Sequence, residues 1–165
     1  MSQPRLLEDV ASVLNDLGVV WWLSDGAALG CVREGRFLPT DPDVDIGLWA
    51  DDEPAVRERL DSEGWEKHPK SIDPTYLRYD AKLDLHGHVR SGETVSFVLG
   101  RQWAYRFSAY LFDSFDSYEF YGMTVRVPSP ADRYLTEHYG ADWRSPRGGW
   151  QWRTDPPCVV DLGAV

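Results

Sequence analysis

The sequence predicts an α+β fold in which helices pack against a mixed β-sheet. Helical and strand patterns alternate through the first third of the chain, an order that places helices against a sheet. Three β-type segments then follow one another between residues 76 and 99, as expected for antiparallel neighbours. No internal repeat or linker divides the chain. We therefore expect one domain over residues 1–165, with its motif-bearing core at about 19–147.

The first half of the chain predicts three helices and two strands. Apolar residues at helical spacing and a glycine that suits the C-terminal cap define the first helix. Acidic residues in the first turn favour the last helix, because they interact well with the helix dipole. In chain order we expect a helix at 4–17, a strand at 19–23, a short helix at 27–33, an aspartate-bearing strand that ends in the apolar run 46–49, and a helix at 53–63.

The second half predicts mainly antiparallel strands. Residues 102–116 are rich in aromatic side chains and have no assignable pattern, and the tail at 148–165 is either irregular or covers the site. Ser129 is expected to cap a helix whose first turn contains Pro130. In chain order we expect strands at 65–68, 76–79, 82–90 and 94–99, a hairpin of 118–121 with 123–127, and a helix at 130–139.

The composition disfavours several classes of protein. The net charge of −10, from 17 basic and 27 acidic side chains, disfavours nonspecific binding to nucleic acid, which requires basic patches. Cys31 and Cys158 are too few for a disulfide framework or a four-cysteine zinc site, and we expect them to be reduced thiols. No apolar stretch reaches the length of a membrane span, and the N-terminus lacks a signal-peptide pattern. We therefore expect a cytoplasmic protein that acts on small molecules.

Three aspartates at every second position, Asp41, Asp43 and Asp45, lead into an apolar run. In a strand, residues two apart project from the same face about 7 Å from each other, so Asp43 and Asp45 would lie side by side. Neighbouring carboxylates repel unless a cation lies between them, and Mg²⁺ or Mn²⁺ prefers such oxygen ligands. The pattern thus indicates either a metal site or an acidic surface turn.

A turn of small and polar residues precedes the aspartates. Ser24, Asp25 and Gly26 follow the apolar strand and open the short helix. A glycine there lets the backbone approach a phosphate, while the helix N-terminus offers free N–H donors. Arg33 and Arg36 lie between this turn and the aspartates, and guanidinium groups suit phosphate oxygens. These five residues are therefore the candidate contacts for substrate phosphate.

Three submotifs in this region resemble those of the LicD and fukutin-related proteins, a branch of the nucleotidyltransferase-fold superfamily. They are residues 26–33 (GAALGCVR), 35–39 (GRFLP) and 41–45 (DPDVD). Three positions depart from the family pattern, because Asp25 replaces a glycine, Thr40 a tryptophan and Pro42 an acidic residue. The resemblance extends over about residues 22–147 and implies a nucleotidyltransferase-like mixed sheet.

The resemblance continues at residues 82–85 (KLDL), where it implies that Asp84 on a neighbouring strand completes a metal site with Asp43 and Asp45. Without the resemblance, the polar face of this segment would indicate a solvated edge strand. His86 projects from the same face. It would contact substrate, tune Asp84, or be an ordinary surface histidine.

The resemblance implies a transferase that depends on Mg²⁺ or Mn²⁺, with Asp43, Asp45 and Asp84 as catalytic metal ligands. Phosphocholine or a polyol phosphate would pass from a CDP-linked, nucleotide-activated donor to the hydroxyl of a sugar or another acceptor. A second hypothesis is a small-molecule nucleotidyltransferase that uses an NTP and releases pyrophosphate. A third is a catalytically degenerate domain that binds a nucleotide or a partner protein without turnover.

Overall fold

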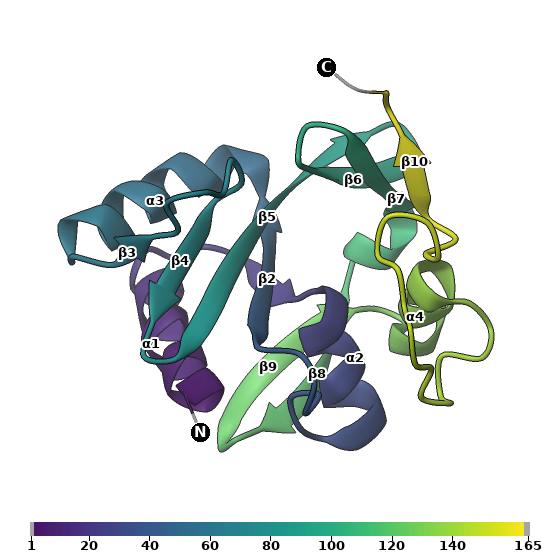
Figure 1. Cartoon of the computed structure of the whole chain (residues 1–165), viewed down its shortest axis with the longest axis horizontal. Coiled ribbons are helices and arrows are strands. Elements are labelled where there is room, and N and C mark those ends of the chain that lie inside the picture. The colour runs from purple at the N-terminus through teal and green to yellow at the C-terminus, as the bar shows by residue number, and fades with distance from the viewer. Residues whose placement is uncertain (1, 164–165) are drawn as a thin grey trace.

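The computed structural model describes residues 2–163 and has the predicted α+β fold, with helices against a mixed sheet (Figure 1). Over these residues the α-helices are α1 (Ser2–Asp16), α2 (Asp25–Glu34), α3 (Glu53–Ser62) and α4 (Ala131–Tyr139). The strands are β1 (Trp21–Leu23), β2 (Asp43–Trp49), β3 (Glu66–Lys67), β4 (Thr75–Arg78), β5 (Ala81–Ser91), β6 (Thr94–Leu99), β7 (Trp103–Ser108), β8 (Phe115–Phe120), β9 (Met123–Pro128) and β10 (Val159–Asp161). None of the helices in this part of the chain has the length and apolar character that a membrane crossing needs.

The main sheet has the order β1-β2-β5-β6-β7-β10, and β4 pairs with the first half of β5 and with β3. All of its neighbouring strands are antiparallel except β2 and β5. In this parallel pair Asp43 stands opposite Lys82 and Asp45 opposite Asp84. The pairing of β2 with β5 therefore brings together acidic residues that are far apart in the sequence.

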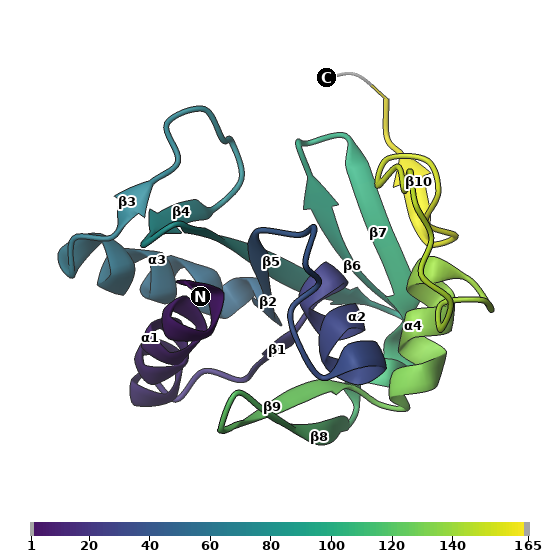
Figure 2. The same cartoon turned by 60° about the horizontal axis from the view of Figure 1, so that its bottom comes forward.

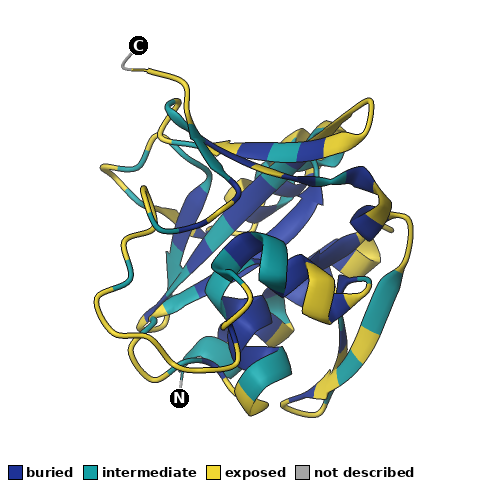
Figure 3. Ribbon diagram, turned by 90° about the vertical axis from the view of Figure 1, so that its right-hand side faces the viewer, coloured by how far each residue is buried: buried dark blue, intermediate teal, exposed yellow. Residues whose placement is uncertain are grey.

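The helices form two groups (Figures 1 and 2). One group, α1 and α3, packs at the end of the sheet that carries β3 and β4, and the other, α2 and α4, lies toward β7 and β10. The β8–β9 hairpin forms a separate two-stranded sheet that contacts β1 and α2. Figure 3 shows the buried residues concentrated on the strands and on the inward faces of the helices, whereas the loops are mostly exposed.

Trp22 is fully buried at the centre of an aromatic cluster that joins the main sheet to the β8–β9 hairpin. Its ring contacts four others, with centroid distances between 4.9 and 5.5 Å, and these belong to Trp49, His88, Phe112 and Phe115. The indole lies over Gly47 on the neighbouring strand, where a Cβ atom would overlap the ring. Gly47 thus provides the space that the largest core side chain requires.

Two strands were not predicted. Strand β7 lies in the unassigned aromatic segment, because Ala104 and Tyr105 are both buried and so break the alternation that identifies a half-buried strand. Strand β10 pairs with its edge, so the tail is not wholly irregular. Residues 164 and 165 of the predicted tail lie outside the described part of the chain.

One local prediction was wrong. Ser129 does not cap α4, since its hydroxyl donates to the Asp116 carboxylate (2.8 Å), and the same carboxylate accepts the backbone N–H of Ala131 (2.9 Å). The polar face of β5 also carries His88, which is not solvated. It is 1% exposed because Phe97 and Phe112 pack on it, with ring centroids at 4.7 and 5.5 Å.

Candidate active site

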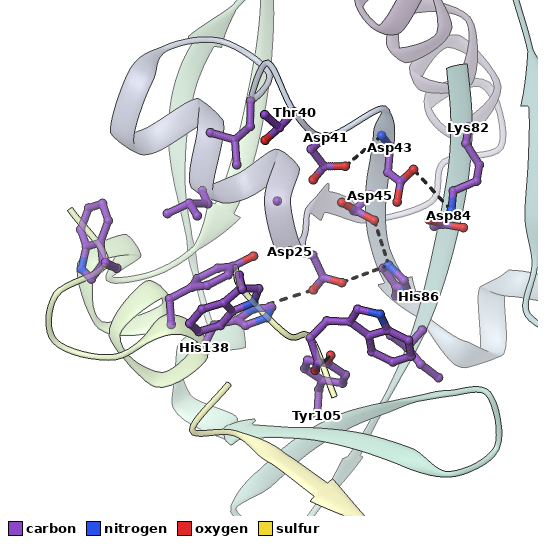
Figure 4. Close-up of a pocket in the computed structure, with 18 of the residues that line it drawn as sticks. Asp25, Thr40, Asp41, Asp43, Asp45, Lys82, Asp84, His86, Tyr105 and His138 are labelled. Atoms are coloured by element: carbon purple, nitrogen blue, oxygen red, sulfur yellow. Dashed lines mark hydrogen bonds and ion pairs between the residues drawn. The ribbon is translucent and has the colours of Figure 1, made fainter. Parts of the chain in front are cut away.

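A cavity of about 1020 Å³ lies where the parallel strands β2 and β5 face the N-terminus of α2 (Figure 4). These three elements supply Asp25, Asp43, Asp45 and Asp84, and α4 and the segment 142–152 form a further wall. Of the tail at 148–165, Gly148, Trp150 and Trp152 line this cavity. Because carboxylates and aromatic rings line one cavity, it can hold both the charged and the planar part of a ligand.

Asp43, Asp45 and Asp84 converge in this cavity (Figure 4). Each contributes one carboxylate oxygen to a group whose atoms all lie within 4.8 Å of one another. Strand geometry explains the arrangement, since Asp43 and Asp45 share one face of β2 and Asp84 is the register partner of Asp45 on β5. Thr75 of β4 orients Asp84 by donating its hydroxyl hydrogen to Asp84 Oδ1 at 2.8 Å.

The aspartates of the cavity are electrostatically strained. Burial and the neighbouring Asp84 carboxylate raise the pKa of Asp43 to about 6. Burial likewise raises the pKa of Asp45 well above its usual value, and that of Asp41 less far. Lys82 Nζ partly relieves this strain, because it lies 3.3 Å from Asp43 and 3.6 Å from Asp84. A further positive charge near these carboxyl groups would therefore stabilise their ionised forms.

The three carboxylates have the chemistry that a hard divalent cation requires. Asp43 Oδ1 is buried and accepts no hydrogen bond from any described residue, although Lys82 Nζ is nearby. Free carboxylate oxygens at this spacing are the ligands that Mg²⁺ and Mn²⁺ prefer. Asp43, Asp45 and Asp84 thus fit such an ion in donor type and separation, and the raised pKa values of Asp43 and Asp45 agree with this.

Asp25, at the first position of α2, links the carboxylates to two buried histidines. Its Oδ2 lies 3.4 Å from His86 Nε2, which is also 3.3 Å from Asp45 Oδ1, and its Oδ1 lies 3.8 Å from His138 Nδ1. Burial alone would lower the pKa of His86, but Asp25 and Asp45 raise it to about 9. Burial lowers the pKa of His138 to about 4. At neutral pH, His86 is therefore a cation inside an acidic cluster, and His138 is neutral.

His86 is consequently not the ordinary surface histidine that was one of its possible roles. Only 5% of it is exposed, because Phe97 packs on its ring at a centroid distance of 4.7 Å. Its nearest polar partners are Asp45 and Asp25 rather than Asp84. The structure thus joins His86 to the aspartate cluster through Asp45.

The candidate phosphate contacts separate into two groups. Asp25, Gly26 and Arg33 line the cavity, whereas Ser24 is buried behind it and Arg36 does not reach it. Ser24 donates its hydroxyl hydrogen to Asp25 Oδ1 at 3.1 Å, so it can position Asp25. Arg36 is 57% exposed and pairs with Glu34. Gly26 lines the cavity. A Cβ atom at this position would overlap the Asp41 carboxylate, so only a glycine leaves room for Asp41 there.

Sequence reasoning did not identify Lys82, His138 or the aromatic residues of the tail as parts of the site. Lys82 was visible as a member of the polar face of β5, and its proximity to two aspartates follows from the β2–β5 register. His138 stands four residues after Tyr134 on the buried face of α4, a spacing that is equally typical of core residues. Nothing in the sequence distinguished these roles.

The chain matches the family described as LicD/FKTN/FKRP, nucleotidyltransferase domain, over residues 18–130. A curated relative, the ribitol-5-phosphate transferase FKTN of Mus musculus, is 31% identical over 173 aligned residues. That alignment covers 96% of this chain but only 37% of the relative, so the chain spans little more than a third of the length of FKTN.

Two solved structures are similar in fold. The lincomycin-bound lincosamide adenylyltransferase LnuA gives a TM-score of 0.56 at 16% identity, over 84% of this chain and 93% of that one. ANT(2″)-Ia in complex with adenylyl-2″-tobramycin gives 0.58 at 15% identity, over 92% and 82%. At these identities the likeness concerns the fold, which is that of nucleotidyltransferases. With the family match over more than half of its length, the chain belongs to the LicD/FKTN/FKRP family of nucleotidyltransferase-fold domains.

Proposed function

We propose that this protein is a divalent-metal-dependent transferase that moves a phospho-substituent from a CDP-linked donor to a sugar hydroxyl. The observation that carries the proposal is the cluster of Asp43, Asp45 and Asp84, whose carboxylate oxygens lie within 4.8 Å of one another in a large cavity. The 31% identical relative is named a ribitol-5-phosphate transferase, which supports polyol phosphate as the transferred group. Phosphocholine remains the other candidate for that group.

We assign different roles in such a transfer to different side chains of the cavity. A bound Mg²⁺ or Mn²⁺ would neutralise phosphate charge and lower the pKa of the attacking hydroxyl. Asp43, Asp45 and Asp84 would hold that ion, and Thr75 orients Asp84 through its hydrogen bond. Lys82 lies beside two of these aspartates, where its ammonium group can donate a hydrogen bond to a phosphate oxygen of the donor. Positioning and charge neutralisation account for most of the catalysis in phosphoryl transfer.

An NTP-dependent nucleotidyltransferase is the second candidate. One structural neighbour is named an adenylyltransferase and the other holds adenylyl-2″-tobramycin, which favours it, and the same aspartates could serve either in-line displacement. The higher identity to FKTN, 31% against 15–16%, favours transfer from a CDP-linked donor. Of the three departures from the family pattern, Pro42 is exposed and does not line the cavity, whereas Asp25 and Thr40 do line it. A degenerate domain is nevertheless disfavoured, because the carboxylates of Asp43, Asp45 and Asp84 are all present and lie close together.

The two enzymatic candidates give different products. With Mg²⁺, a sugar acceptor and CDP-ribitol or CDP-choline, we expect CMP to be released and the phospho-substituent to appear on the acceptor, as measured by mass spectrometry. With CTP or ATP in place of the donor, we expect no pyrophosphate. Acceptor-dependent pyrophosphate without any CMP would instead identify a nucleotidyltransferase, and absence of both products with nucleotide binding retained would identify the degenerate domain.

Binding of the metal should depend on pH. Because the pKa of Asp43 is raised to about 6, the metal-free protein holds a proton there at pH 5 and has mostly lost it at pH 7. A metal ion must displace that proton, so we expect Mg²⁺ to bind about tenfold more weakly at pH 5 than at pH 7. Isothermal titration calorimetry at both pH values measures this. The variant Asp43→Asn should bind weakly at both, and an equal affinity of the unsubstituted protein at pH 5 and pH 7 would contradict the assignment.

A further inference from the structure

One wall of the cavity is aromatic. Tyr139 at the end of α4 and Trp150 in the following segment both line it, and both are partly exposed. The Tyr139 ring stacks on His138 with a centroid distance of 4.1 Å and an interplanar angle of 7°, and Trp150 packs against Tyr139 at 5.2 Å. His138 in turn lies next to Asp25, so the wall is continuous with the acidic cluster. We call Tyr139 and Trp150 the aromatic wall.

The aromatic wall already holds a flat cationic group on one ring face. The guanidinium carbon of Arg147, which also lines the cavity, lies 5.2 Å from the centroid of the Trp150 ring. Arg147 is 58% exposed, and its only ion pair within residues 2–163, at 3.8 Å to Asp155, is a surface pair of the kind that contributes little to stability. A planar ligand can therefore take the place of this guanidinium on Trp150 and leave Arg147 free for a phosphate.

The opposite side of the cavity is polar. The loop between β3 and β4 contributes His68, Ser71 and Asp73 to the lining, side chains that suit the hydroxyl groups of a sugar. In an in-line displacement the attacking hydroxyl and the leaving group lie on opposite sides of the phosphorus. With the phosphate at the aspartates, the acceptor and the leaving nucleotide must therefore occupy different walls.

We infer that the aromatic wall is the subsite for the nucleobase of the donor, which stacks on Trp150 in the place of the Arg147 guanidinium. The inference rests on the proposed function, since it assigns one part of the donor to one part of the same cavity. Every nucleobase has a π-face, so stacking alone accepts cytosine and adenine alike. The wall therefore supplies affinity for a nucleotide rather than choice of base.

The test compares two ligands that differ only in the base, CMP and ribose 5-phosphate, by calorimetry in the presence of Mg²⁺. We expect the unsubstituted protein to bind CMP at least about tenfold more tightly. Trp150→Ala should remove most of that difference, whereas Trp150→Phe, which keeps a ring, should retain most of it. Trp103→Ala, at a tryptophan that does not line the cavity, is the matched control and should leave the difference unchanged.

Because binding is measured without turnover, the inference and the proposed function fail separately. Loss of CMP preference in Trp150→Ala supports the subsite even where no transfer is detected. Transfer that proceeds while Trp150→Ala binds CMP as the unsubstituted protein does would overturn the subsite and leave the function standing. A Trp150→Ala variant that binds CMP normally but has a raised KM for the acceptor would assign the wall to the sugar instead, and so also overturn the inference.

Discussion

Asp45→Asn is expected to reduce transfer by about a thousandfold or more while the protein stays folded. Asp45 is the member common to both acidic groups, since its oxygens lie with Asp43 and Asp84 on one side and with Asp25 and His86 on the other. An amide cannot replace a carboxylate as a ligand for a hard cation, and metal stabilisation of a phosphoryl-transfer transition state is worth several kcal/mol, with each 1.4 kcal/mol equal to a factor of ten.

The fold should survive because the substitution keeps the shape of the side chain. It also removes a buried carboxyl group, whose pKa is raised because burial disfavours its charged form. Circular dichroism and a thermal melt check this. We expect Mg²⁺ to raise the melting temperature of the unsubstituted protein, and this increase should disappear in Asp45→Asn together with the activity. Asp51→Asn is the matched control, because Asp51 is exposed and does not line the cavity. Full activity of Asp45→Asn would refute the assignment of the metal site.

Trp22→Ala is expected to lower the free energy of unfolding by about 3–5 kcal/mol, the range seen when a buried large aromatic is truncated. The indole is fully buried and contacts the rings of Trp49, His88, Phe112 and Phe115. Its removal leaves a cavity between β1 and the β8–β9 hairpin that these neighbours cannot fill without rearrangement. Urea denaturation followed by circular dichroism measures the change.

Trp22→Phe separates ring packing from the polar atom of the indole. The Trp22 Nε1 hydrogen is buried and has no acceptor among the described residues, so its loss removes an unsatisfied donor. We therefore expect Trp22→Phe to cost clearly less than the alanine substitution, roughly 1 kcal/mol. Equal losses for both variants would show that the hydrogen-bonding group, and not the packed ring, carries the stability.

The acidic core of the site was predictable because it depends on local geometry. Alternation along β2 puts Asp43 and Asp45 on one face whatever the strand pairs with. That Asp84 would join them required a neighbouring strand, and the family resemblance supplied it before the register between β2 and β5 was known. Most helices and strands were likewise predicted, because their apolar spacing and their glycine stops are properties of short segments.

The remainder of the site depends on contacts between distant segments, for which the sequence carries no local pattern. Asp25 and His138 are 113 positions apart and meet only because α4 returns beside α2. His86 looked solvated because strand alternation says which face a side chain takes but not what covers that face, which here is Phe97 of β6. Trp150 lies in a segment without periodicity, so its position on the cavity wall could not be foreseen.

The parallel pairing of β2 with β5 also has a consequence for the order of events in folding. Asp45 and Asp84 are 39 positions apart, and the segment between them includes α3, β3 and β4. Closing this long crossover costs chain entropy before the paired strands contribute any stabilising contacts. Such non-local pairings therefore form slowly. The like-charged carboxylates repel one another as they approach. An ion bound by these carboxylates would bind only after that closure. It would therefore act mainly by slowing unfolding, because interactions absent from the transition state leave the folding rate almost unchanged.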